Sequence, residues 1–180
     1  MREVFEFHLP SRFVVGTVGP VDEREFFIQA KDDKRLVTIA LEDTQADVLS
    51  QGLDRILDEL LKMGVDVPVS DPPDLDLEAL SQPIDLEFGA QSMGLAWNEL
   101  TQLVTLEING EWHSEDIPDV ESDEPDGPPC LRVRLSLKQA RAFIVRTNRI
   151  LAFGAKPCQY CQLPLEPAGH ICPRANGYRR

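Results

Sequence analysis

The C-terminal end of the chain concentrates most of its metal-binding side chains. Cys158 and Cys161 are separated by two residues, and His170 and Cys172 follow in the same short segment. The whole chain of 180 residues contains only four cysteines and three histidines. Thiolate and imidazole groups are the ligands that zinc prefers, and a tetrahedral structural site needs four of them. The spacing therefore predicts a Cys3His zinc knuckle formed by these four residues.

A redox-active dithiol is the main alternative for Cys158 and Cys161. In thioredoxin-like proteins such a pair opens a helix that follows a strand, whereas here Pro157 precedes the pair and no helix-start signal follows it. A redox pair would also leave His170 and Cys172 without a role. Four protein ligands leave no position open for water, which favours a structural rather than a catalytic zinc.

The remaining cysteine and histidines lie outside this segment. Cys130 is expected to be a half-buried, small apolar residue, and a role as a substitute metal ligand is the less favoured alternative. His8 and His113 are far apart in the sequence with no nucleophile pattern beside them, so both are expected to be ordinary surface or turn residues. We predict no catalytic residues in this chain.

The charge and hydropathy of the chain restrict its environment. Its net charge is −13 and its pI is about 4.6, which disfavours non-specific binding of nucleic acid through the whole surface. Hydrophobic residues make up 42%, enough for a core, but no apolar run is long enough to span a membrane. The N-terminus lacks the apolar core of a signal peptide. We therefore expect a cytoplasmic protein, and a reducing compartment favours a metal site over a disulfide.

The C-terminal tail differs in charge from the rest of the chain. Residues 156–180 carry a net charge of +3, which leaves −16 on the preceding residues. Such a tail can bind a separate acidic partner, but docking on its own acidic body, or simple solubility, is the favoured interpretation. The candidate ligand- or partner-binding residues are Arg174, Asn176, Tyr178, Arg179 and Arg180. Beside a zinc knuckle these residues could also contact RNA or phosphate.

The first part of the body, residues 1–65, reads as four strands followed by a helix. Runs rich in β-branched and aromatic residues predict strands over 4–7, 13–18, 25–30 and 36–41. Apolar residues at a spacing of three and four predict an amphipathic helix over 44–63. Asp43 or Thr44 can cap its start, and Gly64 suits the left-handed position just after its end.

The second part of the body, residues 84–154, repeats this order after a linker rich in proline and aspartate at 66–83. Strands are predicted over 84–88, 93–97, 103–108 and 131–137. Ser136 and Gln139 form the capping box of a second helix, which is expected to stop at Gly154. Residues 111–129 are expected to form a mobile acidic loop, and residues 155–180 form the knuckle and basic tail.

The order strand, strand, strand, helix, which the two halves share, predicts an internal duplication. Residues 37–49 align without a gap on residues 133–145, and Phe13 to Pro20 resembles Phe88 to Leu95. The expected product is an α+β body with two antiparallel sheets and two helices, related by a pseudo-twofold axis, with the zinc knuckle appended.

The two ends of the chain resemble a known family. The ending Cys-x-x-Cys…Gly-His-x-Cys-Pro-Arg-x-Asn-Gly-Tyr-Arg-Arg and the opening Phe-x-x-Pro-x-Arg-Phe look like an uncharacterised actinobacterial family of about this length, known only as a domain of unknown function. The resemblance covers the whole chain. It implies a cytosolic bacterial protein and no established activity. Members are often encoded beside a histidine-phosphatase-like and a kinase-like protein, which implies a phosphate-related pathway or a shared complex.

Three hypotheses for function follow. The first is a non-enzymatic zinc-binding interaction or adaptor protein that presents a metal-ordered basic tail to a protein partner. The second is an enzyme with a cleft between the two halves, in which Arg174 or Arg179 binds a phosphorylated ligand. The third is weak RNA binding through the tail alone. No catalytic motif supports the second hypothesis, and we favour the first.

Overall fold

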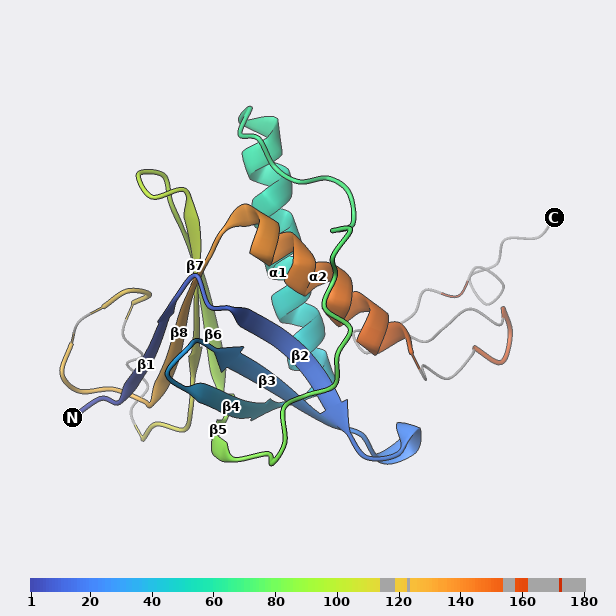
Figure 1. Cartoon of the computed structure of the whole chain (residues 1–180), viewed down its shortest axis with the longest axis horizontal. Helices are drawn as coiled ribbons and strands as arrows, with labels where there is room; N and C mark the ends of the chain where they lie inside the picture. The colour runs from blue at the N-terminus through green and yellow to red at the C-terminus, as the bar shows by residue number, and fades with distance from the viewer. Residues whose placement is uncertain (114–118, 123, 154–157, 162–171, 173–180) are drawn as a thin grey trace.

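The computed structural model describes residues 1–113, 119–122, 124–153, 158–161 and 172 of the chain. These residues form an α+β fold with two four-stranded sheets and two long helices, as predicted from the sequence (Figure 1). A single turn of 3-10 helix, Val21–Glu23, connects two of the strands.

Each sheet contains strands from both ends of the body. Sheet 1 has the order β2 (Arg12–Val18), β3 (Glu25–Lys31), β4 (Leu36–Leu41) and β5 (Leu86–Gly89). Sheet 2 has the order β1 (Val4–His8), β8 (Cys130–Leu135), β7 (Leu103–Asn109) and β6 (Ser92–Asn98). Neighbouring strands are antiparallel except for one parallel pair in each sheet, β4–β5 and β1–β8.

The parallel pairs arise because the two halves exchange their first strands. The N-terminal half comprises β1 to β4 and α1 (Asp43–Lys62), and the C-terminal half comprises β5 to β8 and α2 (Leu137–Ala152). Strand β1 joins the sheet of the C-terminal half, and β5 joins the sheet of the N-terminal half. The two parallel pairs differ from the antiparallel sheets expected from the sequence, because strand patterns do not specify a strand's neighbour.

Both helices begin with the same capping arrangement. In α1 the side chains of Glu42 and Gln45 form a reciprocal capping box, and in α2 Ser136 and Gln139 do the same. The cap of α1 is therefore Glu42 rather than the predicted Asp43 or Thr44. Gly64 follows α1 with a φ of +85°, the left-handed conformation expected for it. Among the residues that the structure describes, no helix is both long and apolar enough to cross a membrane.

A capping box follows the last strand of each predicted half. Glu42 comes directly after Leu41, the last residue of β4, and Ser136 comes directly after Leu135, the last residue of β8. The gapless alignment of the sequences instead pairs Leu41 with Leu137, the first residue of α2. An alternating apolar pattern matches itself after a shift of two residues, so the alignment by letters and the positions of the caps differ by one alternation.

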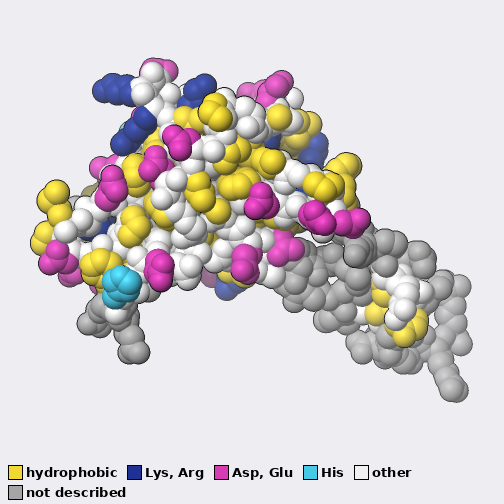
Figure 2. Space-filling model, turned by 90° about the horizontal axis from the view of Figure 1, so that it is seen from below, with side chains coloured by type: hydrophobic (Ala, Val, Ile, Leu, Met, Phe, Trp, Pro, Cys, Tyr) yellow, Lys and Arg dark blue, Asp and Glu magenta, His cyan; other side chains and the backbone are white. Residues whose placement is uncertain are grey.

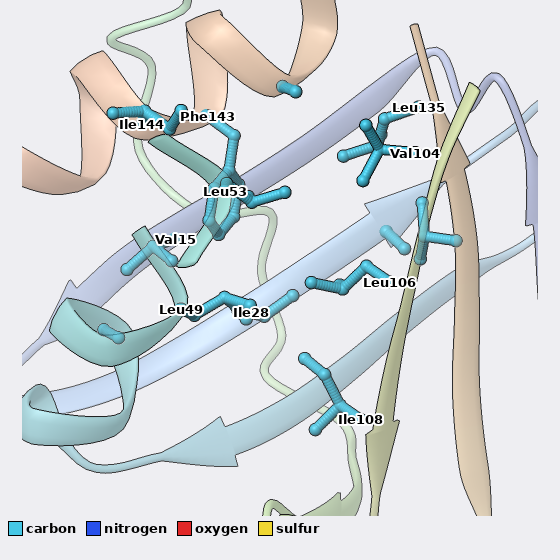
Figure 3. Close-up of a cluster of buried hydrophobic side chains, with 14 of the residues drawn as sticks. Val15, Ile28, Leu49, Leu53, Val104, Leu106, Ile108, Leu135, Phe143 and Ile144 are labelled. Carbon is cyan, nitrogen blue, oxygen red and sulfur yellow. The ribbon is translucent and has the colours of Figure 1, made fainter. Parts of the chain in front are cut away.

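The core lies where the two sheets and the two helices meet. Figure 3 shows side chains that converge from all four layers: Val15 and Ile28 from sheet 1, Leu106 and Ile108 from sheet 2, Leu49 and Leu53 from α1, and Phe143 and Ile144 from α2. Helix α2 also lies against β2, where the rings of Phe13 and Phe143 stack with centroids 4.8 Å apart. Fully burying one such side chain contributes about 1.5–3 kcal/mol, so this cluster provides most of the stability of the fold.

The linker covers the outer face of sheet 1. Leu80 is buried there against Val14 and Phe27, apart from the main core.

In Figure 2 acidic side chains are spread over the exposed face of the body, as expected for a chain with a net charge of −13.

Candidate metal centre

Three of the four predicted zinc ligands come together beyond the end of α2. The sulfur atoms of Cys158, Cys161 and Cys172 all lie within 4.8 Å of one another, with Cys158 and Cys172 buried. The distance between the Sγ atoms of Cys158 and Cys172 is 3.7 Å. Two thiolates bound at about 2.3 Å to one tetrahedral zinc lie about 3.8 Å apart. The arrangement of these cysteines can therefore hold a metal ion.

The turn after Cys158 favours the thiolate form of its sulfur, which is the form that can act as a ligand. The backbone N–H groups of Cys161 and Tyr160 donate hydrogen bonds to this sulfur, and they lower the pKa of Cys158 to about 6 against the opposing effect of burial. A thiolate rather than a thiol is the form that binds a metal. Residues Gln159–Cys161 form a turn in the described part of this segment.

The other predicted residues of this region lie outside the described part of the chain. These residues are His170, the expected fourth ligand, and the tail residues Arg174, Asn176, Tyr178, Arg179 and Arg180. The three described cysteines are compatible with the predicted Cys3His set.

Cys130 does not belong to this cluster. It lies in β8 and is fully buried rather than half-buried as expected. Burial, followed by the negative charge of Glu107, raises its pKa to about 11. A thiol with this pKa is a poor ligand and a poor nucleophile at neutral pH. His8 and His113 are exposed, as predicted.

A buried charge cluster on the outer face of sheet 2 was not predicted. The Glu107 carboxylate lies 2.5 Å from Nε of Arg132 and 3.4 Å from Nη2 of Arg2, and all three side chains are at least nine-tenths buried. Arg2 also donates to the carbonyl oxygens of Ser122 and Pro128, so the cluster ties the N-terminus to the acidic loop. The sequence feature that could have revealed this cluster is the alternation of arginines along β8, which lies opposite the acid in β7.

The enzyme hypothesis expects a cleft between the halves with convergent ionisable groups. A cavity of about 300 Å³ is lined by β2, α2 and the linker. Its arginines bind the linker itself: Nε of Arg12 lies 2.6 Å from the Asp76 carboxylate, and Arg146 donates to the carbonyl oxygens of Val15, Asp76 and Glu78. These charged groups pair with one another and hold the linker in place.

The same charges explain two shifted pKa values in this cavity. Hydrogen bonds from the Arg12 guanidinium hold the pKa of Asp76 below its ordinary value. Burial lowers the pKa of Arg146 from its ordinary value, and the nearby charge of Asp76 opposes this shift. The lowered pKa of Asp76 favours its carboxylate form, which pairs with Arg12 and Arg146.

Comparison with known proteins assigns a family but no activity. No curated protein and no solved structure matches the chain. One family model matches residues 5–172. This range includes the three clustered cysteines, both helices and all eight strands, apart from the first residue of β1. The chain belongs to the family described as "Protein of unknown function (DUF3090)".

Proposed function

We propose that this chain is a zinc-binding interaction protein, in which a structural zinc orders the C-terminal segment and presents its basic residues to a protein partner. The observation that carries the proposal is the separation of 3.7 Å between the sulfur atoms of Cys158 and Cys172. That distance suits two thiolates on a shared zinc, while it is far longer than the bond of about 2.05 Å in a disulfide.

The metal's role in the proposal is structural. Cys158, Cys161 and Cys172 supply three thiolates and His170 supplies the fourth ligand, so the zinc has no open position for water. Residues 154–180 contain few large apolar side chains. Metal binding, which contributes about 10–16 kcal/mol in small zinc modules, takes the place of a hydrophobic core there.

The basic residues after the knuckle make the proposed contact with a partner. Arg174, Arg179 and Arg180 are close in sequence to Tyr178, and arginine and tyrosine are enriched where protein interfaces bury their strongest contacts. The acidic body disfavours nucleic acid as the main partner.

The experiment is affinity purification of the tagged full-length protein from its own host at natural abundance. Wild type is expected to carry one zinc per chain and to co-purify with a protein that Cys172→Ser loses. Cys130→Ala is the matched control, because it removes a buried thiol outside the cluster and is expected to keep both. Equal recovery of the partner with Cys172→Ser would contradict the proposal.

A further inference from the structure

The outer face of sheet 2, on the side away from the core, is polar on three of its four strands. Side chains at alternate positions of a strand point to the same face. The register forms one row across this face, from β6 to β1: Gly94, Glu107, Arg132 and Glu6. The next row contains Ala96, Thr105, Arg134 and His8. The β6 end of both rows therefore has no large side chain, and the other strands present polar or charged groups.

Three consecutive residues of the acidic loop lie on this face. Val120 lies on the bare β6 end, where a Cβ placed on Gly94 would come within 2.5 Å of its Cγ2 atom. The carbonyl oxygen of Ser122 accepts hydrogen bonds from Nη2 of Arg132 at 2.8 Å and from Nη1 of Arg2 at 3.3 Å. The face thus contacts an apolar side chain and, two residues further on, a backbone carbonyl group.

Glu121, between these two residues, makes the most specific contacts. Its carboxylate accepts hydrogen bonds from Oγ1 of Thr105 at 2.9 Å and from Nε of Arg134 at 3.0 Å. Its backbone N–H donates to the Glu107 carboxylate at 2.9 Å. Burial raises the pKa of Glu121, but the hydrogen bonds from Thr105 and Arg134 outweigh this effect and lower the pKa below its ordinary value. The face therefore binds the charged form of this side chain.

Contacts of this kind are those by which a protein recognises an acidic peptide. Val120 is the one apolar residue in 119–122, and the side chains that hold the segment include the buried groups of Arg2, Glu107 and Arg132. Buried ion pairs are often no more stabilising than apolar side chains of the same volume, so stability alone does not explain them. Charge-assisted hydrogen bonds from arginines to a carboxylate and to a backbone carbonyl instead provide specificity for an acidic segment.

The loop occupies this face with a strained backbone. Glu121 has a φ of +67°, in the left-handed region that residues with a side chain rarely adopt. A peptide that is not joined to β7 and β8 at its two ends can present the same groups without this strain. When Glu121 leaves, the charged groups of the face are three arginines against two glutamates: Arg2, Arg132, Arg134, Glu6 and Glu107. The vacated face therefore favours a ligand that supplies a carboxylate.

We infer that the outer face of sheet 2 is a binding site for an acidic peptide of a partner protein, and that residues 119–122 occupy this site in cis. The peptide carries an apolar residue directly before a glutamate. Its glutamate binds Thr105 and Arg134, and its apolar side chain lies over Gly94. The site belongs to the body and needs neither the zinc nor the C-terminal tail, so it goes beyond the function proposed above.

The test is binding of a fluorescent peptide to the full-length protein after the loop side chains are removed. The double variant Val120→Ala, Glu121→Ala takes away the occupant and keeps every residue of the sheet. The probe is a synthetic peptide with the sequence of residues 117–124, and the matched control peptide has glutamine in place of the glutamate that corresponds to Glu121. Fluorescence anisotropy is expected to show that the double variant binds the probe about tenfold more tightly than wild type does, because the tethered loop no longer competes.

Two further comparisons show where the peptide binds. The double variant is expected to bind the control peptide about tenfold more weakly than the probe. Adding Arg134→Gln to the double variant removes this preference, whereas adding Arg55→Gln, which changes an exposed arginine of α1, keeps it. Equal binding of the probe by wild type and the double variant, or equal binding of the two peptides by the double variant, would overturn the inference.

A second measurement needs no substitution. If residues 119–122 leave the face reversibly, the amide of Glu121 should exchange about a hundredfold faster than the core amides of β7, although it donates to a buried carboxylate. Equal protection of Glu121 and β7 would identify the segment as a permanent cover and overturn the inference.

Two other results separate this site from its alternatives. Cys172→Ser is expected to bind the probe as wild type does, so loss of the metal proposal leaves this inference standing. A wild-type dimer in sedimentation that Glu121→Ala dissociates would assign the site to the loop of a second copy, which would overturn the inference of a separate partner.

Discussion

The Sγ atoms of Cys158 and Cys172 lie 3.7 Å apart across fourteen residues of sequence. Cys161 completes a triangle of sulfur atoms with them. Most of the expectations for the C-terminal segment depend on what occupies the centre of this triangle.

Replacing one of these thiols is expected to release the C-terminal segment and leave the body folded. Cys161→Ser removes one ligand of the proposed zinc, and residues 154–180 contain few large apolar side chains that could replace the energy of metal binding. Amide exchange is expected to speed up beyond residue 157 and to stay unchanged in the core strand β7. Equal protection of the C-terminal segment in Cys161→Ser and wild type would show that the metal does not order it.

The linker is expected to depend on Arg146 far more than on its neighbour Arg149. Arg146 is buried and donates to the carbonyl oxygens of Val15, Asp76 and Glu78. Arg146→Ala leaves these acceptors without a donor, at a cost of about 2–4 kcal/mol in the free energy of unfolding. Arg149→Ala breaks only an exposed pair with Asp71 and should cost less than about 1 kcal/mol. Urea denaturation of both variants measures the difference, and equal costs would contradict the role given to Arg146.

The contribution of Asp76 to stability is expected to disappear in acid. Its pKa is lowered in the folded protein, chiefly by hydrogen bonds from Arg12. A carboxyl group with a lowered pKa stabilises the fold above its ordinary value of 3.8, and this contribution is lost as the pH falls through the folded pKa. Because the group is partly exposed, Asp76→Asn should cost about 0.5–1 kcal/mol at pH 7. Urea titrations at neutral and acid pH measure the difference in free energy of unfolding between wild type and Asp76→Asn. This difference should become smaller in acid, and a larger difference in acid would refute the assignment.

Glu107 is expected to be the most sensitive acid of sheet 2. It lies buried between Arg2 and Arg132, so Glu107→Gln removes the carboxylate that pairs with Arg2 and the nearer of the two that pair with Arg132, at a cost of about 3 kcal/mol. Glu6→Gln is the control, because Glu6 is half exposed and should cost less than about 1 kcal/mol. Thermal unfolding of the two variants compares them directly. A cost for Glu107→Gln no larger than for the control would mean that this cluster is solvated.

The sequence allowed the elements and the metal cluster to be predicted because both depend on local spacing. The period of apolar residues identified α1 and every strand to within a few residues. The four-residue pattern from Ser136 to Gln139 identified the start of α2. The convergence of Cys158, Cys161 and Cys172 followed from ligand chemistry in a short segment.

The pairing of strands and the partners of buried charges could not be predicted in this way. Strand β1 pairs with β8 across most of the chain, and a strand pattern is equally compatible with any neighbour. The alternating pattern of β7 and β8 does not show that Glu107 and Arg132 are buried, because Arg2 and Arg132 reach carbonyl oxygens in a distant segment, those of Pro128 and Ser122. The helical pattern of α2 does not show that Arg146 is buried, since the linker carbonyls that it binds are distant in the sequence.

Native mass spectrometry of the full-length protein, purified without added metal or chelator, tests the zinc site directly. We expect one zinc ion per chain, which Cys172→Ser loses and Cys130→Ala keeps. A metal-free protein whose mass is lower by a pair of hydrogens would instead show a disulfide within the C-terminal segment. That result would contradict the metal centre and the function proposed from it.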